Sequence, residues 1–142
     1  MENKRITVET IVNKSIDQVW EKWTMPKHIM EWNNASDDWY TPSAENDLRA
    51  GGSFNYKMAA RDGSFSFDFG GIYTEVIPGK KISYTLGYTI DDGRKVVVEF
   101  SQKDGGVKIV ETFEAEQTNS LEMQRSGWQA ILDNFKRYAE IA

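Results

Sequence analysis

Residues 95–141 read KVVVEFSQKDGGVKIVETFEAEQTNSLEMQRSGWQAILDNFKRYAEI, and this stretch decides the fold. Apolar and polar residues alternate on both sides of a Gly-rich turn at 104–106, which predicts antiparallel strands over Lys95–Lys103 and Val107–Glu116. The period then becomes helical, with an apolar stripe made of Leu121, Trp128, Leu132, Phe135 and Ala139. The stretch therefore predicts a long amphipathic helix over 119–141 that covers one face of an antiparallel sheet.

Two details of this helix are predicted from its sequence. Asn119 is expected to cap it, with Glu122 completing a capping box. Gly127 costs about 1 kcal/mol relative to alanine inside a helix. Its position beside Trp128 therefore indicates a packing or clearance role.

Upstream, the alternation of apolar residues predicts four more strands, at 4–13, Ser53–Ala60, Phe65–Ile77 and Ile82–Thr89. Gly70 and Gly71 predict a bulge or bend in the third of these strands.

Between the first two strands, a capping box of Ser15 and Gln18 opens a short helix over 15–24. Pro26 opens a second short helix that ends at about Trp32. Residues 33–50 show no clear period and are expected to form an irregular stretch, functional or mobile.

These elements predict an α+β fold with one domain over residues 1–142. Six strands joined mainly by tight turns form a curved antiparallel sheet in the order 1-6-5-4-3-2, and the last helix lies across its concave face.

Composition excludes several classes of function. The chain has 142 residues, a net charge of −5 and a pI near 4.9, which argue against nucleic acid or an anionic membrane surface as partner. It has no cysteine and one histidine, His28, so we expect no metal site, no cofactor and no cysteine or histidine catalysis. No signal peptide or membrane span is apparent, and we expect a cytoplasmic protein.

Several short segments resemble one family. They run in the family's order along nearly the whole chain: SIDQVW (15–20) followed by Trp23 and Trp32, DLRAGGSF (47–54), GIYTEV (71–76) before Pro78, ISYT (82–85) and Gly127-Trp128. Together they are similar to the AHSA1-like family, named after the activator of the 90-kDa heat-shock chaperone's ATPase, within the START/Bet v 1-like (SRPBCC) helix-grip superfamily.

The resemblance implies an apolar cavity between the curved sheet and the long helix. Members of the superfamily bind lipids, sterols, polyketides or plant hormones, and a few catalyse cyclisation or dehydration. The eukaryotic chaperone activators carry an additional N-terminal domain. This chain begins at its first predicted strand, so we expect that domain to be lacking and chaperone activation to be doubtful.

The candidate ligand contacts are residues expected on the concave face, on the long helix and at the cavity mouth. They are Trp32, Trp39, Phe54, Tyr56, Tyr73, Tyr84, Val98, Phe100, Glu111, Phe113, Gln124, Arg125, Trp128, Leu132 and Phe135. Aromatic residues at these periods usually form a packed core. The resemblance favours a partly open cavity instead.

Glu111 stands on the apolar face of its predicted strand. A buried carboxylate is costly unless paired, so its pKa should rise, and Arg125 or Arg49 could pair with it. Three interpretations stay open: a ligand-anchoring or acid/base group, a structural ion pair, or a shifted alternation that exposes the side chain.

Other candidates have simpler interpretations. Asp47 and Arg49 are expected to brace a tight loop that is not a phosphate loop. His28 is expected on the surface, and the acidic pairs at 37–38 and 91–92 are solvated turns. The aromatic residues Trp32, Trp39 and Tyr40 either cover the cavity mouth or pin the loop to the body.

The sequence thus predicts a non-catalytic protein that binds a small hydrophobic or aromatic molecule. The alternatives are a protein-interaction module with a chaperone as partner, and an enzyme of the cyclase or dehydratase kind. Monomer and homodimer both remain open.

Overall fold

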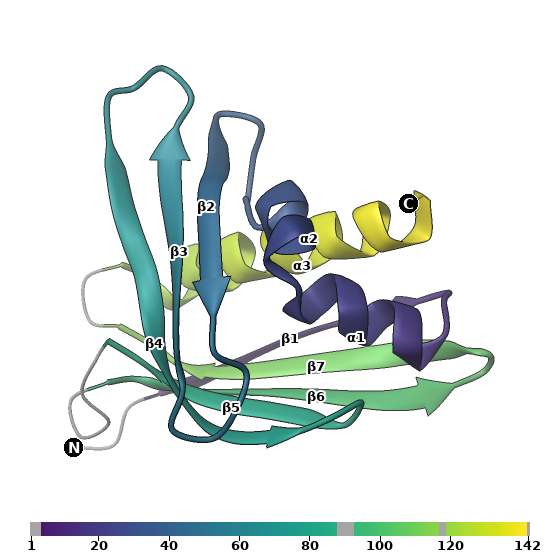
Figure 1. The fold of residues 1–142 in the computed structure, drawn as a ribbon. Helices are drawn as coiled ribbons and strands as arrows, with labels where there is room; N and C mark the ends of the chain where they lie inside the picture. The colour runs from purple at the N-terminus through teal and green to yellow at the C-terminus, as the bar shows by residue number, and fades with distance from the viewer. Residues whose placement is uncertain (1–3, 88–92, 117–118, 142) are drawn as a thin grey trace.

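A strongly curved antiparallel sheet wraps around one long helix in the computed structural model, which describes residues 4–87, 93–116 and 119–141 (Figure 1). The strands are β1 (Arg5–Val12), β2 (Trp39–Asn46), β3 (Ser53–Ala60), β4 (Ser66–Ile77), β5 (Lys81–Leu86), β6 (Lys95–Lys103) and β7 (Gly106–Glu114). The helices are α1 (Ile16–Thr24), α2 (Pro26–Trp32) and α3 (Leu121–Ile141).

The sheet order is β1-β7-β6-β5-β4-β3-β2, and every pair is antiparallel. The predicted α+β helix-grip architecture and the predicted order of six strands are confirmed. The end of the strand predicted up to residue 89 and the acidic pair at 91–92 lie outside the described residues.

The prediction of an irregular stretch over 33–50 was wrong, because β2 adds a seventh strand at the edge beside β3. Pro42 lies inside β2, and the register shifts between Tyr40 and Ser43. Proline is tolerated only on edge strands or at bulges, and a bulge breaks the period of two. Because of these two features, β2 lacks the alternation of apolar and polar residues by which the other strands were predicted.

Helix α1 begins as predicted, with Ser15 and Gln18 forming a complete capping box. Helix α3 begins one residue later than predicted. Ser120, and not Asn119, accepts the backbone N–H of Met123, whereas the Asn119 N–H donates to the Glu116 carboxylate. Asn119 therefore holds the turn before the helix instead of capping it.

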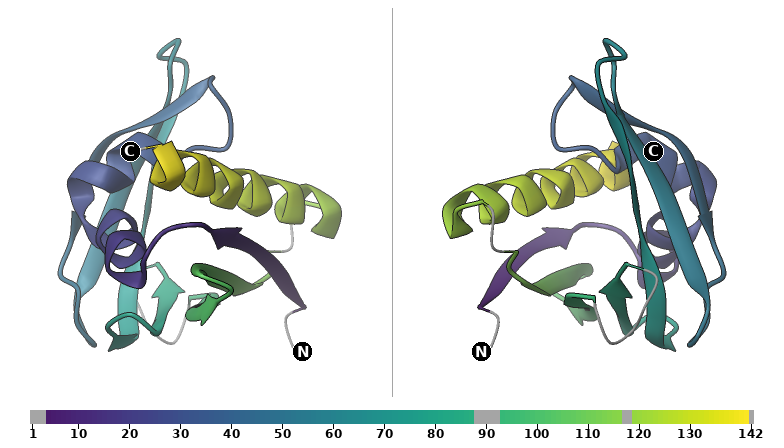
Figure 2. Two further views of the ribbon diagram at one scale, coloured as in Figure 1. Left: turned by 90° about the vertical axis from the view of Figure 1, so that its right-hand side faces the viewer. Right: turned by 90° about the vertical axis from the view of Figure 1, so that its left-hand side faces the viewer.

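Helix α3 lies over β1, and polar side chains of the helix bond to the free edge of this strand (Figure 2). Arg125 donates to the Thr7 carbonyl at 2.7 Å, Gln129 to the Glu9 carbonyl at 3.1 Å and Lys136 to the Ile11 carbonyl at 2.6 Å. Alternate carbonyls of an edge strand are thus satisfied by one helix, which also blocks edge-to-edge association there.

The half of the concave face formed by β1, β7 and β6 is solidly packed. The buried side chains of these strands include Val8, Val98 and Phe113, and α3 covers them with the buried Leu132 and Phe135. Helix α1 adds Trp23, whose ring meets Phe100 and Phe135 edge to face at 5.7 and 4.8 Å. In this half of the sheet the aromatic residues therefore form a packed core.

Gly71 marks a close approach of two strands. A Cβ atom at this position would lie 1.9 Å from the Thr85 carbonyl oxygen of β5. The predicted bulge lies just beyond the glycine pair, where the register shifts between Tyr73 and Glu75.

We expect Gly71→Ala to lower the free energy of unfolding by more than about 2 kcal/mol, because β4 and β5 must separate to admit the methyl group. Gly127→Ala is the matched control. A Cβ there meets nothing within 4 Å, and removing a helical glycine should stabilise by about 1 kcal/mol. Urea unfolding of both variants measures the two changes. Equal stability of the two variants would contradict the close approach.

Candidate functional site

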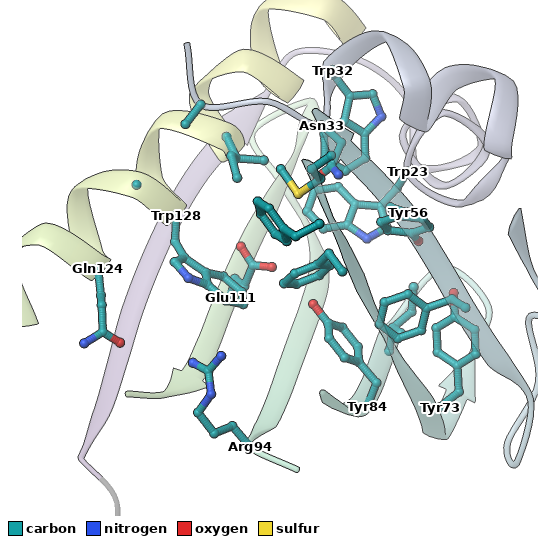
Figure 3. Close-up of a pocket in the computed structure, with 18 of the residues that line it drawn as sticks. Trp23, Trp32, Asn33, Tyr56, Tyr73, Tyr84, Arg94, Glu111, Gln124 and Trp128 are labelled. Atoms are coloured by element: carbon teal, nitrogen blue, oxygen red, sulfur yellow. The ribbon is translucent and has the colours of Figure 1, made fainter. Parts of the chain in front are cut away.

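The other half of the concave face, toward β3, β4 and β5, is hollow. A cavity of about 340 Å³ lies between these strands and α3 (Figure 3). Most of its lining is apolar or aromatic, with a few polar and charged side chains. The lining residues are Trp23, Thr24, Trp32, Asn33, Ala35, Leu48, Phe54, Tyr56, Met58, Phe67, Phe69, Tyr73, Ile82, Tyr84, Arg94, Glu111, Glu116, Asn119, Gln124, Gly127, Trp128 and Ile131. This volume and this lining are typical of small-molecule sites.

The structure divides the predicted contact residues into two groups. Eight of them line the cavity: Trp32, Phe54, Tyr56, Tyr73, Tyr84, Glu111, Gln124 and Trp128. The remaining seven do not: Trp39, Val98, Phe100, Phe113, Arg125, Leu132 and Phe135. Five of these seven fill the packed core. Alternation places a residue on a face of the sheet, but it does not say whether helix α1 fills the space above it.

Aromatic rings form the floor of the cavity around Phe54. The centroid of its ring lies 5.2 Å from Tyr56, 5.1 Å from Tyr73 and 5.0 Å from Tyr84. Burial raises the pKa of Tyr56 and of Tyr84 well above the ordinary value, and a side-chain hydrogen bond with Tyr73 adds to the rise at Tyr56. The tyrosines are therefore neutral hydroxyls that can donate or accept hydrogen bonds at neutral pH.

Trp128 forms the wall on the helix side. Its indole stacks on Phe113 at 3.9 Å with an interplanar angle of 10°, and Phe69 meets it edge to face at 6.1 Å. These contacts hold the ring against β7, so one face of the indole packs on the core residue Phe113.

Gly127 leaves a gap in the same wall. Residues three and four apart on a helix lie on one face, so position 127 lies between Gln124 and Ile131, which both line the cavity. A Cβ atom at 127 meets nothing within 4 Å. The clearance role predicted for this glycine therefore consists of leaving the cavity open.

Glu111 points into the cavity from β7 and is 7% exposed (Figure 3). Its carboxyl group has no hydrogen-bond or ion-pair partner among the described residues. Burial raises the pKa of Glu111 from 4.5 to about 8. Glu111 is therefore a neutral carboxylic acid at neutral pH, and the interpretation that exposes it is wrong.

The arginines predicted to pair with Glu111 lie elsewhere. Arg125 bonds to the edge of β1, outside the cavity, and Arg49 forms an exposed ion pair with Asp47 at 2.8 Å. That ion pair confirms the bracing role predicted for the loop. Neither arginine forms an ion pair with Glu111, so the interpretation of Glu111 as part of a structural ion pair with Arg125 or Arg49 is wrong.

The arginine that lines the cavity is Arg94, which the sequence analysis missed. It directly precedes β6, and its guanidinium donates to the Glu114 carbonyl at 3.3 Å. The alternation of Val96, Val98 and Phe100 places these residues on the concave face. Continued one step back, the same alternation would have placed Arg94 there too.

Other predicted residues have structural roles. The Gln124 amide bonds to the backbone of Glu116 and Asn119, so it ties α3 to the end of β7. Trp39 does not line the cavity; it packs edge to face on Phe65 and on Phe67, and Phe67 lines the cavity.

The prediction that His28 is a free surface residue was wrong. It is partly buried, and its Nδ1 lies 2.6 Å from the Tyr138 hydroxyl, so it joins α2 to α3. Burial lowers its pKa.

Two further findings bear on function. Within residues 4–87, 93–116 and 119–141, no group of three or more acidic or histidine side chains is arranged to hold a metal ion. In the same part of the chain, no helix has the length and apolar character needed to cross a bilayer.

Glu111 should make stability depend on pH. Between about pH 4.5 and pH 8 the unfolded chain has lost the Glu111 proton while the folded chain holds it, so this group lowers stability as pH rises. The difference between the two pKa values corresponds to at most about 5 kcal/mol. We expect Glu111→Gln to be more stable than the unchanged protein, by a margin that widens up to about pH 8.

Urea unfolding at several pH values measures this margin. His28 is present in both proteins, so its contribution to the pH dependence cancels. A margin that does not change with pH would show that Glu111 is not held neutral.

Comparison with solved structures identifies close structural relatives. The AHSA1-like protein from Aeromonas hydrophila is 43% identical, with a TM-score of 0.89 over 97% of this chain and 93% of that one. A protein from Cytophaga hutchinsonii is 51% identical, with a TM-score of 0.81 over 96% and 92% of the two chains. CalU16 from Micromonospora echinospora shares the fold at 20% identity, with a TM-score of 0.72 over 97% and 77%.

Among curated proteins, none matches this chain in sequence. The family model for activator of Hsp90 ATPase homolog 1-like proteins matches residues 13–140. That match spans most of the chain and agrees with the helix-grip fold and with the relative from Aeromonas hydrophila. The chain therefore belongs to the AHSA1-like family.

Proposed function

We propose that this protein binds a small apolar or aromatic molecule in the cavity between the sheet and α3. The observation that carries the proposal is the cavity itself, about 340 Å³ in volume and walled by aromatic rings with a few polar groups. Burial of a ligand against such rings supplies the hydrophobic free energy, and the polar groups orient it.

The polar groups around the cavity support the proposal further. Glu111 is buried with no partner among the described residues, and the half-buried Tyr84 lies close enough for Glu111 to raise its pKa. Buried polar groups without partners are costly in a core, whereas a ligand can supply the missing hydrogen bonds.

Position 127 offers a direct test, because it lines the cavity and a Cβ atom there meets nothing within 4 Å. We expect Gly127→Phe to fold normally and to bind at least about tenfold more weakly, since the ring occupies the ligand's space. Gly127→Ala is the matched control for the helix and should bind like the unchanged protein.

The measurement is a fluorescence titration with a panel of fatty acids, sterols, flavonoids and aromatic polyketides, together with native mass spectra. Trp23, Trp32 and Trp128 line the cavity and report its occupation. Equal binding by the unchanged protein and by Gly127→Phe would place the ligand elsewhere and reject the proposal.

A second candidate function rests on exposed aromatic side chains near the tip of the β3–β4 hairpin. Phe65 is 60% exposed and Phe67 41% exposed, and both contact Trp39. Apolar patches of this kind mark protein–protein contacts. The family's name supplies the partner to test, a 90-kDa heat-shock chaperone.

For this candidate we expect Phe65→Ser to weaken binding to the purified chaperone about tenfold or more, because Phe65 is the most exposed of these rings. Phe65 does not line the cavity, so ligand binding should stay unchanged. Binding is measured by calorimetry, with the chaperone's ATPase rate as a second measurement. Unaltered chaperone binding by Phe65→Ser would exclude this patch as the contact.

A further inference from the structure

The polar groups of the cavity gather in one part of it. Figure 3 shows the Tyr84 hydroxyl and the Arg94 guanidinium pointing toward the part of the cavity where the Glu111 carboxyl group and the Trp128 indole lie. The pKa of Tyr84 is affected by both of the other groups, since Glu111 raises it and Arg94 lowers it. Tyr84 thus lies within the electrostatic influence of both groups, and all three side chains line the cavity.

Arg94 carries a positive charge at the wall of the cavity. Within the described residues its guanidinium forms no ion pair, and its bond to the Glu114 carbonyl uses one of five N–H donors. Glu116 also lines the cavity, but its carboxylate is bound by the Asn119 backbone and side chain. Arg94 therefore has donors available toward the cavity.

Glu111 does not neutralise this charge either. Its carboxyl oxygens lie beyond ion-pair distance of the guanidinium, and burial keeps the group protonated at neutral pH. A neutral carboxylic acid has an O–H that donates a hydrogen bond, as the hydroxyl of Tyr84 can. The site therefore presents one cation and two hydroxyl donors to a ligand.

We propose that the ligand is an amphipathic organic acid, with its apolar body on the aromatic floor and its anionic group held by Arg94, Glu111 and Tyr84. The inference rests on the proposed binding function. Charge-assisted hydrogen bonds from a guanidinium to a carboxylate are the strongest available here, and the apolar surroundings strengthen them.

The ionisable groups that line the cavity together with Glu111 decide how binding depends on pH. They are Tyr56 from β3, Tyr73 from β4, Tyr84 from β5, Arg94 before β6 and Glu116 after β7. Helix α3 contributes only uncharged residues to the lining, and Val8 is the residue of β1 opposite Glu111. Burial holds the pKa of each of the three tyrosines above its ordinary value. Glu111 is therefore the group at the site that changes charge near pH 8.

The test compares two probes of the same shape, 2-naphthoic acid and 2-naphthamide, by calorimetric titration. At neutral pH we expect the acid to bind at least about tenfold more tightly than the amide. Arg94→Gln should remove this preference by weakening only the acid. Arg5→Gln, which changes an exposed arginine of β1 outside the cavity, is the matched control and should keep it.

A second measurement separates Glu111 from Arg94. Affinity for the acid should fall as pH rises through about 8 in the unchanged protein, because ionised Glu111 repels the bound anion. Glu111→Gln keeps a donor without a charge, so its affinity for the acid should stay level across the same range.

Two outcomes would overturn the inference, and they differ in what they say about the binding function. If acid and amide bind equally and Gly127→Phe blocks both, the cavity binds ligands without selecting acids. If neither probe binds up to about millimolar concentration, the inference falls together with the proposed function for aromatic ligands.

Discussion

The position of α3 depends on the hydrogen bonds between its polar side chains and the free edge of β1. Arg125, Gln129 and Lys136 bond to carbonyls at every second residue of the strand, and Glu140 accepts the N–H of Asn13 just beyond it. The helix is thereby held along one edge of a curved sheet. Helix α1 fills the space beside it through Trp23, whereas the cavity lies between α3 and the strands β3, β4 and β5.

Most of the fold could be predicted from the sequence, because each element follows a local rule that the chain obeys. Strand alternation, the capping box at Ser15 and the apolar stripe of α3 are all visible in short windows of sequence. Strand β2 could not be predicted in this way. Pro42 and the register shift after Tyr40 break its alternation, and only pairing with β3 makes it a strand. What makes residues 39–46 a strand is the pairing with β3, and the sequence of the segment itself does not show it.

The candidate site was harder to predict than the fold, since a face of a sheet can be filled or empty. Phe54 and Phe113 both lie on the concave face, yet Phe54 lines the cavity and Phe113 is covered by Trp128. Whether a residue of this face is covered depends on where α3 and Trp23 lie above the sheet, and no local sequence pattern predicts those positions. Arg94 is different, because its place follows from extending the alternation of β6 by one residue.

The two residues that keep the cavity open and polar both lower stability. A helical glycine at 127 costs about 1 kcal/mol against alanine, which would fit without contact. Glu111 is buried without a partner among the described residues, where an apolar side chain would avoid desolvation. An unfilled cavity also forgoes the packing that larger side chains would supply. Violations of local rules that gather in one place, without a compensating contact in the protein, are typical of binding sites. The proposed ligand would supply the missing packing and hydrogen bonds, and this is the argument for a binding cavity over a packing defect.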